Sequence, residues 1–286
     1  MDIAVLGMGN MGRALAARLL QGEHRVRVWN RTRGRAADVV ATGAQEVATV
    51  ADAVLGADAA ITMLANDDAV RSVALGPLRE ALEEQAVYMD CSTVSPSLSA
   101  ELAAAFPGRY LAVPILGNPV AVRAGQAILL AGGDRVLVDR LRPVLAALSP
   151  AVRRYDNASL AGAAKLASNL LLLSEVVALA ESVAVGRAGG LSDEQLRDLL
   201  GDSPLVEGVR NRFEDVLTGA RDTWWSNALG AKDARLAVEL ARGANVELPD
   251  ADTVYRRYEA ASAAGLADAD IAAVAELYRR PAAPVG

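Results

Sequence analysis

Cysteine and histidine are almost absent from this chain of 286 residues, which contains one of each, Cys91 and His24. A single cysteine excludes an internal disulfide and a metal site built from cysteines. A single histidine excludes a site with several histidine ligands. Carboxylate ligands alone stay open, although no cluster of Asp and Glu indicates such a site, so we expect no metal.

Aromatic residues are also scarce, at 4% of the chain, whereas 52% of the residues are hydrophobic and 22% are charged. The chain can therefore bury a large core, which must consist mainly of Ala, Val and Leu. Its length suits two domains of ordinary size. Acidic residues outnumber basic ones, which gives a net charge of −6. We therefore do not expect non-specific binding to nucleic acid.

Neither a leader segment nor a long apolar run stands out. The N-terminus leads directly into the first predicted strand and carries an acid, Asp2, which is not typical of a signal peptide. The most apolar stretch, Leu170–Val185, is interrupted by Ser174, Glu175 and Glu181, which predicts that it does not cross a bilayer. We expect a cytoplasmic protein with no membrane partner.

A glycine-rich turn lies between a predicted strand, Ile3–Leu6, and a predicted helix, Arg13–Leu20. Its residues are Gly7, Met8, Gly9, Asn10, Met11 and Gly12. A G-x-G-x-x-G motif alone is weak evidence, but a strand before it and a helix after it favour dinucleotide binding. In that reading Gly7 makes the turn, Gly9 admits the pyrophosphate to the backbone, and Gly12 lets the helix pack closely.

The end of the second predicted strand, Val26–Trp29, indicates which dinucleotide binds. NAD-binding folds usually place Asp or Glu there, on the ribose 2′-hydroxyl. This chain instead has neutral Asn30, then Arg31 and Thr32, with further arginines at 33 and 35. Guanidinium groups bind a 2′-phosphate that a carboxylate would repel. The pattern predicts NADP(H) rather than NAD(H), although arginines on a solvated loop are common.

The first half of the chain alternates strands and helices, which predicts an α/β Rossmann domain, doubly wound and mainly parallel, over residues 1–157. Further strands are predicted at Ala59–Leu64, Val87–Asp90, Tyr110–Val113 and Ala127–Leu130. Helices are predicted near Arg33–Ala41, Asp67–Val73, Pro96–Ala105 and Arg135–Ala147.

From residue 158 to 286 the sequence predicts an all-helical domain. The helices are expected at Ser159–Ala188, after an N-cap at Ser192, and at Ala228–Gly243, Asp250–Gly265 and Asp268–Arg280, with a frayed tail from Pro281. The boundary between the domains is expected at the start of the long helix, and the cleft between them is the expected active site.

Three segments carry residues suited to chemistry. Ser92 and Thr93 follow a strand, where they could contact a nicotinamide or a substrate, or cap the next helix. Lys165 and Asn169 are four residues apart, so they share a helix face in an apolar stretch. A desolvated lysine can exchange a proton near neutral pH, although most helical lysines extend to solvent. Lys232 begins a later, otherwise ordinary charged segment.

Taken in order, these motifs resemble those of the β-hydroxyacid dehydrogenase family, which includes 3-hydroxyisobutyrate dehydrogenase, tartronate semialdehyde reductase and glyoxylate reductase. The resemblance covers nearly the whole chain. It includes the glycine motif, Asn30-Arg31-Thr32, Asp90-x-Ser92-Thr93-x-x-Pro96, Lys165-x-x-x-Asn169, Lys232-Asp233 and the segment from Gly265 to Asp270.

The resemblance implies roles for several residues. Lys165 would be the general acid when a carbonyl is reduced and the base when an alcohol is oxidised, while Asn169 would hold the reacting oxygen. Lys232 would reach the cofactor, as would Met63 and Leu64 near the adenosine and Thr93 near the nicotinamide ribose. The family also implies a homodimer or homotetramer built on the long helix and a small-molecule substrate.

The chain departs from the family at the substrate loop. The family usually has Pro-Val-Ser-Gly-Gly, whereas this chain reads Pro114-Ile115-Leu116-Gly117-Asn118. Leu116 replaces a hydrogen-bonding serine and Asn118 replaces a glycine, so a small carboxylate substrate loses a donor. We still expect Ser92, Leu116, Gly117, Asn118 and Trp224 to contact the substrate. The tryptophans at 224 and 225 suit a larger or less polar substrate, or are ordinary core aromatics.

Two alternatives stay open. Imine reductases share the architecture and the NADP-type strand end, although they usually have Asp or Tyr in place of Lys165. A non-catalytic dinucleotide-binding scaffold is the other alternative, although such relatives typically lack the lysine. The complete set of motifs favours an enzyme, an NADP(H)-dependent oxidoreductase that transfers hydride to or from a carbonyl or hydroxyl carbon.

Overall fold

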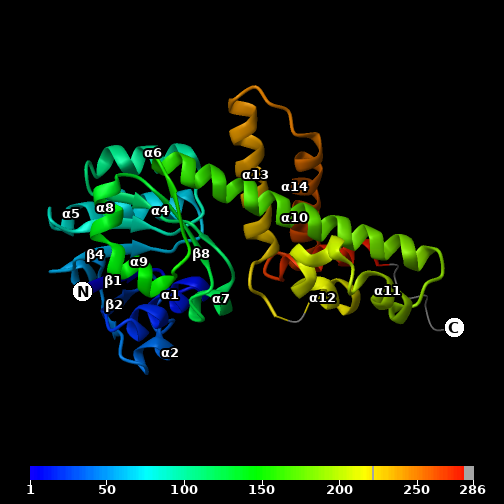
Figure 1. The fold of residues 1–286 in the computed structure, drawn as a ribbon, viewed down its shortest axis with the longest axis horizontal. Helices are drawn as coiled ribbons and strands as arrows, with labels where there is room; N and C mark the ends of the chain where they lie inside the picture. Colours follow the sequence, from blue (N-terminus) through cyan, green and yellow to red (C-terminus); the bar gives the residue numbers. More distant parts are fainter. Residues whose placement is uncertain (221, 280–286) are drawn as a thin grey trace. The chain divides into compact units, whose positions relative to one another are not determined.

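The computed structural model describes residues 1–220 and 222–279, and the chain divides into two compact units. The first unit comprises Met1–Lys165 and the second begins at Leu166 (Figure 1). Each unit has its own buried core, so each is described by itself.

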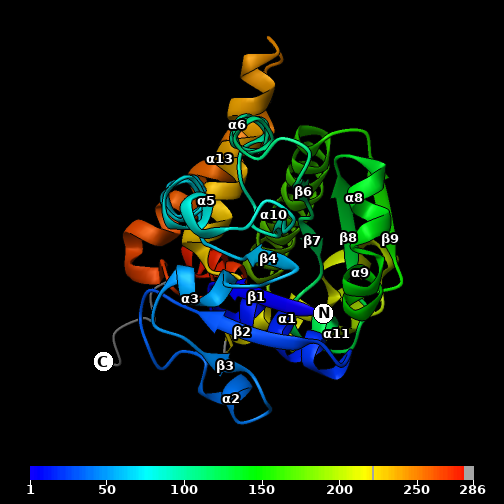
Figure 2. The ribbon, with the colours of Figure 1, turned by 90° about the vertical axis from the view of Figure 1, so that its left-hand side faces the viewer.

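The first unit is built on a single nine-stranded sheet (Figure 2). Its order is β3-β2-β1-β4-β5-β6-β8-β7, with β9 paired to β8. Pairing is parallel from β3 to β6, antiparallel from β8 to β6 and to β7, and parallel from β9 to β8. The strands are β1 (Asp2–Leu6), β2 (Arg25–Trp29), β3 (Gln45–Glu46), β4 (Ala59–Thr62), β5 (Val87–Asp90), β6 (Tyr110–Ala112), β7 (Ile115–Leu116), β8 (Ile128–Gly132) and β9 (Val152–Tyr155).

Helices cover both faces of this sheet. Alternate strand residues point to opposite sides, and apolar residues on both sides must be buried. Ile3 and Val5 of β1 belong to one hydrophobic cluster and Ala4 and Leu6 to the other. The helices are α1 (Asn10–Gln21), α2 (Ala37–Val40), α3 (Val50–Val54), α4 (Asp67–Val73), η1 (Ala74–Leu78), α5 (Arg79–Ala81), α6 (Pro96–Ala105), α7 (Pro119–Arg123), α8 (Arg135–Arg140) and α9 (Arg142–Leu148). Residues of α1, α8 and α9 belong to the first cluster, and those of α3, α4 and α6 to the second. The predicted Rossmann architecture is confirmed.

Three strands were not predicted from the sequence, and each lacks the apolar run that indicates a buried strand. β3 and β7 are two residues long. β9 is an edge strand whose central residues, Arg153 and Arg154, are exposed, and charged side chains are usual on such edges. The helix predicted near Arg33–Ala41 is shorter, since only Ala37–Val40 is helical.

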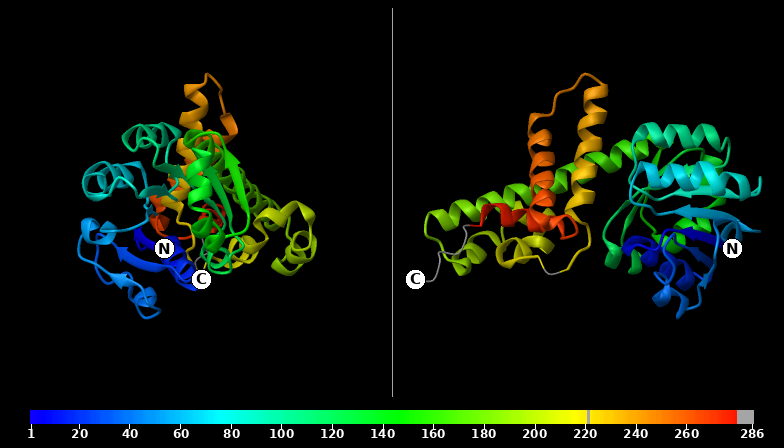
Figure 3. Two further views of the ribbon diagram at one scale, coloured as in Figure 1. Left: turned by 60° about the vertical axis from the view of Figure 1, so that its left-hand side comes forward. Right: turned by 180° about the vertical axis from the view of Figure 1, so that it is seen from behind.

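The second unit is helical, and a single bridge between Ser226 and Asp270 is the only β pairing among its described residues. Its elements are most of α10 (Ala158–Ala188), α11 (Asp193–Leu200), η2 (Pro204–Arg212), α12 (Phe213–Thr218), α13 (Asn227–Gly243), α14 (Pro249–Ala261), η3 (Ser262–Leu266) and η4 (Ile271–Tyr278). The antiparallel helices α13 and α14 lie side by side (Figure 3). Ser192 caps α11 as predicted, in a capping box with Gln195.

The last predicted helix is a 3₁₀ segment, η4, rather than an α-helix. The predicted end at Arg280 and the tail from Pro281 lie outside the described residues.

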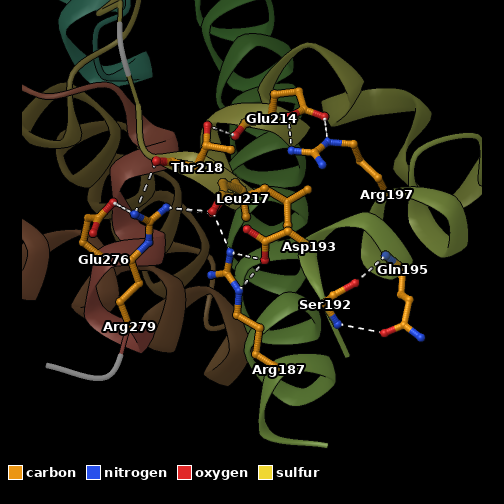
Figure 4. A network of polar contacts seen from close by, with 11 residues as sticks. Arg187, Ser192, Asp193, Gln195, Arg197, Glu214, Leu217, Thr218, Glu276 and Arg279 are labelled. Carbon is orange, nitrogen blue, oxygen red and sulfur yellow. Dashed lines mark hydrogen bonds and ion pairs between the residues drawn. The ribbon is translucent and has the colours of Figure 1, made fainter. Parts of the chain in front are cut away.

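Two arginines of the second unit donate to the same backbone carbonyl (Figure 4). Arg187 of α10 donates to Asp193 at 2.7 Å and to the Leu217 carbonyl at 2.7 Å. Arg279 donates to the same Leu217 carbonyl at 3.0 Å. Both cations thus meet the C-terminal carbonyls of α12, where the helix dipole favours positive charge.

The long helix α10 contributes to both cores. Ala158 and Ala161 belong to the second cluster of the first unit, and the Gly132 backbone lies so close that a Cβ there would meet Ala161 Cβ at 2.6 Å. Leu173 and Val176 belong to the core of the second unit. The expected domain boundary at residue 157 is the start of this helix, whereas the compact units divide after Lys165.

By length and composition, α10 could cross a membrane, and 39% of its most apolar stretch is buried in the structure. The two glutamates and the serine in this segment are therefore not enough, by composition, to exclude a span. Both cores use residues of this helix, which accounts for the buried part of its apolar surface.

Candidate functional site

The three glycines of the glycine-rich turn lie in different surroundings. Gly7 has a φ of +108°, a conformation that favours glycine, and its amide donates to the Trp29 carbonyl at 2.8 Å. A Cβ on Gly12 would lie 1.9 Å from the Gly7 carbonyl oxygen, so α1 packs directly on the turn. A Cβ on Gly9 would meet nothing within 4 Å. The turn therefore leaves open space at Gly9, beside the N-terminus of α1, as pyrophosphate binding requires.

The other residues of the turn have clear positions. Met8 is buried, and Met11 packs against the same hydrophobic cluster. Asn10 is exposed at the start of α1 and accepts a hydrogen bond from Arg13 at 2.9 Å. A polar side chain is therefore present at the open end of the turn.

Asn30 joins the glycine turn to the loop after β2. Its Oδ1 accepts from the Met8 amide at 3.0 Å, and its Nδ2 donates to the Thr32 carbonyl at 2.7 Å. An Asp in its place could make the first hydrogen bond but has no donor for the second. The amide of Asn30 therefore holds this loop in place.

The arginines of this loop are exposed. Arg31, Arg33 and Arg35 form no ion pair within the described parts of the chain. Thr32 is exposed as well, and the Gly34 amide donates to Glu46 at 3.0 Å. The loop therefore presents cationic side chains whose charge no neighbouring carboxylate neutralises by direct pairing.

Two further loops begin where β4 and β5 end. Met63 and Leu64 are half-buried after β4, and the Leu64 amide donates to Ser92 Oγ at 3.0 Å. Thr93, also half-buried, follows Ser92 and lines the same narrow pocket. The carboxyl ends of these strands thus bring together residues predicted to contact the cofactor and the substrate.

The sequence did not single out Asp90 as a site residue, although it is the most buried carboxylate in the first unit, with 1% of its surface exposed. Asp90 Oδ1 accepts from Thr62 Oγ1 at 2.7 Å and from the Ser92 amide at 3.0 Å. Burial raises the pKa of the Asp90 carboxyl to about 6, although hydrogen bonds from Thr62 and Ser92 lower it. An Asp ending an otherwise apolar strand was the available signal.

Lys165 lines a narrow pocket of the first unit rather than extending to solvent. Its Nζ donates to the Ile115 carbonyl at 2.6 Å. The pocket is lined by Asp90, Ser92, Thr93, Val94, Ser99, Ala112, Pro114, Gly162 and Lys165. Gly162 lies one turn before the lysine, and a Cβ there would lie 3.5 Å from Ser99 Oγ. The predicted acid–base residue and the Ser92–Thr93 segment therefore share one pocket.

Asn169 and Lys232 meet through a buried acid in the second unit. Asn169 Nδ2 donates to Asp233 Oδ2 at 2.7 Å, and Lys232 Nζ lies 2.6 Å from Asp233 Oδ1. Asp233 is 2% exposed. The sequence pair Lys232-Asp233 was noted, but the contact with Asn169 joins residues 64 positions apart and has no sequence signal.

The predicted substrate-loop residues have structural roles. Leu116 is half-buried against the second hydrophobic cluster and opposes Ile128 across the β7–β8 ladder. Gly117 has a φ of +140°. Asn118 caps α7, since its Oδ1 accepts from the Ala121 amide at 2.8 Å. The side-chain oxygen of Asn118 is thus used as the helix cap, and its side-chain nitrogen, Nδ2, is the group that could contact a substrate.

Trp224 is held in the second unit by a buried ion pair. Asp270 Oδ2 accepts from the Trp224 amide at 3.1 Å and from the Trp225 amide at 3.2 Å. Its Oδ1 accepts from Arg212 Nε at 3.2 Å, and the Arg212 guanidinium lies 5.9 Å from the centre of the Trp224 ring. Trp225 packs on the core, whereas Trp224 is half-buried above the arginine.

Two family profiles match the chain, one after the other. The profile described as the NAD binding domain of 6-phosphogluconate dehydrogenase matches residues 2–156. The profile described as NAD-binding of NADP-dependent 3-hydroxyisobutyrate dehydrogenase matches residues 160–278.

Individual proteins are similar along their whole lengths. The uncharacterised oxidoreductase YfjR of Bacillus subtilis is 33% identical, with 96% of this chain and 98% of that protein covered. The 2-(hydroxymethyl)glutarate dehydrogenase of Eubacterium barkeri is 28% identical, with 97% and 95% covered. The 3-hydroxyisobutyrate dehydrogenase of Mycobacterium tuberculosis, solved with L-serine, has a TM-score of 0.84 at 27% identity, with 97% and 99% covered.

An imine reductase from a Pseudomonas species shares the fold, with a TM-score of 0.61 at 19% identity, over 97% of this chain and 99% of that one.

Proposed function

Because this chain belongs to the β-hydroxyacid dehydrogenase family, whose members are NAD(P)-dependent dehydrogenases and reductases, we propose that it uses NADP(H) and that Lys165 is its general acid and base. The reaction is the interconversion of a carbonyl and a hydroxyl group on a small substrate. The observation that carries the proposal is the position of Lys165 in a pocket with Ser92 and Thr93.

The residues of the first unit fit a bound dinucleotide. Open space at Gly9 and the N-terminus of α1 suit the pyrophosphate. Arg31, with Thr32 beside it, is exposed at the strand end where a 2′-phosphate would bind. Bound NADPH supplies a hydride to the substrate carbon. NADP(H) is favoured because Asn30, unlike Asp or Glu, adds no negative charge at this place.

Lys165 is suited to hold a proton at the reacting oxygen. The Ile115 carbonyl accepts one of its three N–H groups and orients the ammonium. The ammonium can donate to a substrate oxygen in reduction, and the neutral amine can accept the hydroxyl proton in oxidation. Asn169, one helical turn further along α10, is the proposed second donor to that oxygen.

The substrate is proposed to be larger or less polar than 3-hydroxyisobutyrate. Leu116 offers an apolar side chain where the family usually has a serine, and a substrate carboxylate beside it would be desolvated without a partner. Asn118 retains one amide nitrogen as a donor, so a neutral polar group could still be bound.

The test is a screen of small aldehydes, keto acids and cyclic imines for NADPH oxidation, followed by the Lys165→Met variant on the best substrate. General acid catalysis contributes about 100- to 10,000-fold, so kcat should fall by that order while NADPH still binds. Full turnover by Lys165→Met on a carbonyl substrate would refute the proposed role of the lysine.

Imine reduction is the second candidate, because the apolar Leu116 replaces the serine of the family pattern. An imine arrives already protonated at nitrogen, so its reduction needs less help from an acid. Activity on cyclic imines that survives Lys165→Met, without activity on carbonyls, would favour this candidate. A protein that binds NADPH but reduces nothing in the screen would favour the non-catalytic alternative.

We also propose that the protein is a homodimer or homotetramer. Three large apolar residues of α10 are exposed in the single chain, Leu160 by 46%, Leu171 by 62% and Val185 by 73%. Exposed apolar side chains along one long helix suit a protein interface. A monomer by light scattering at micromolar concentration would contradict this.

A further inference from the structure

Asp90 lies where two neighbouring strands of the sheet stop pairing. Thr62 of β4 and Asp90 of β5 oppose each other in the last pair of the ladder. The last backbone hydrogen bond between the strands runs from the Cys91 amide to the Thr62 carbonyl at 2.9 Å. Beyond it the amides of Leu64 and Ser92 have no strand partner, and side chains accept from both of them.

These side-chain contacts form a continuous chain. Asp90 Oδ1 accepts from the Ser92 amide, which fixes the backbone of Ser92. The hydroxyl of that residue then accepts from the Leu64 amide at 3.0 Å. On the other side, Thr62 Oγ1 donates to Asp90, so the Tyr88 hydroxyl must donate to Thr62, at 2.9 Å. The loops after β4 and β5 are thus tied together through one carboxylate.

We propose that Asp90 is a positioning residue, which holds the Ser92–Thr93 loop and the Met63–Leu64 loop at the spacing that cofactor binding needs. The inference rests on the proposed function, because these two loops are the ones expected to contact the nicotinamide ribose and the adenosine. Asp90 itself touches neither of the reacting groups in this proposal. It acts through the two amides.

Two hydrogen bonds to a single oxygen require a side-chain acceptor with two lone pairs at position 90. Oδ1 receives both Thr62 and Ser92, as a carboxylate oxygen with two lone pairs can. An asparagine could accept both at its carbonyl oxygen, provided that its NH₂ group found a partner. An alanine could accept neither, and the Ser92 amide would be left buried without an acceptor.

The first measurement is amide hydrogen exchange of the cofactor-free protein. In Asp90→Ala, the Leu64 and Ser92 amides should exchange about tenfold faster or more, whereas amides in the middle of β1 should change much less. Asp90→Asn should restore most of this protection. Uniform acceleration throughout the first unit would indicate general destabilisation and would overturn the positioning role.

The second measurement is the Kd for NADPH by fluorescence titration. The loss of one hydrogen bond to a charged group suggests that Asp90→Ala weakens binding about tenfold or more, with partial rescue in Asp90→Asn. Ser92→Ala, which removes the acceptor of the Leu64 amide and keeps Asp90, should weaken binding in the same direction. This variant keeps the test decisive if Asp90→Ala fails to fold.

Tyr88→Phe is the matched control. Tyr88 is fully buried and its hydroxyl contacts Thr62. Removing this hydroxyl leaves both hydrogen bonds to Asp90 in place, so the Kd for NADPH should stay within about twofold. Equal weakening by Tyr88→Phe and Asp90→Ala would overturn the inference. If the wild-type protein does not bind NADPH while its Leu64 and Ser92 amides respond as expected, the proposed cofactor fails and the loop contacts stand.

Discussion

The ionised carboxylate of Asp90 should cost folding free energy at neutral pH. Its pKa is raised from 3.8 to about 6 by burial, and a pKa difference of one between the folded and unfolded states corresponds to about 1.4 kcal/mol. The charged form therefore destabilises the folded state by about 3 kcal/mol relative to the protonated form. An asparagine of the same shape never ionises, so Asp90→Asn removes this cost.

The sign follows from linkage. The folded state binds the proton of Asp90 more tightly than the unfolded state. The protonated carboxyl therefore stabilises the folded state, and this contribution is complete below about pH 4. It is lost as the pH rises through about 6. The stability of Asp90→Asn relative to wild type should therefore increase by about 3 kcal/mol between pH 3 and pH 7.5. The change should be complete near pH 7.

The assay is urea unfolding of both proteins, followed by circular dichroism at several pH values. Other titrating groups are common to the two proteins, so they cancel in the difference. The ionisable groups around Asp90 are Tyr88, Tyr110, Cys91, Asp67 and Lys165. Burial raises the pKa of both tyrosines and of the cysteine well above their usual values, so they stay neutral here. A difference in stability that does not vary with pH, or that falls as the pH rises, would refute the reasoning.

The remaining predictions concern the cofactor and the substrate. Arg31→Ala should raise the KM for NADPH at least about tenfold, since a hydrogen bond to a charged group is worth about 1.5–3 kcal/mol, and should barely change that for NADH. Asn30→Asp should act in the same direction, because the loop loses its donor to Thr32 and gains negative charge; a wild type that prefers NADH in steady-state kinetics would contradict both. Leu116→Ser should raise kcat/KM for small hydroxy acids about tenfold or more and lower it for larger apolar carbonyls. If wild type already oxidises 3-hydroxyisobutyrate efficiently, Asn118 supplies the donor and Leu116 has no part in selectivity.

The sequence predicted the elements whose signals are local. β5 and the helices α4 and α6 occur at the predicted residues. A short apolar run identifies β5, Pro96 at the first helical position identifies α6, and acidic residues in the first turn mark the start of α4. The edge strand β9 was not predicted, because its pairing with β8 depends on the neighbouring strand and not on Arg153 and Arg154 themselves.

The site was predictable as a set of residue types and not as a set of contacts. Lys165 and Asn169 could be paired from helix periodicity alone. The contact of Asn169 with Asp233 depends on how α10 and α13 pack, and no spacing encodes it. Asp90 was not predicted as a site residue for a similar reason, since the sequence alone does not show that its carboxylate is buried away from solvent.

Within six residues, the glycine turn contains glycines that folding requires and a glycine that only ligand binding requires. Gly7 and Gly12 are needed by the folded chain itself, since a methyl group at either would collide with backbone atoms. Gly9 has no such constraint, so only a ligand can explain a requirement for glycine there. Gly9→Ala should therefore unfold like the wild type and yet lose the dinucleotide. In a library scored for abundance, position 9 would accept many residues and positions 7 and 12 few, whereas a library scored for turnover would accept glycine alone at all three.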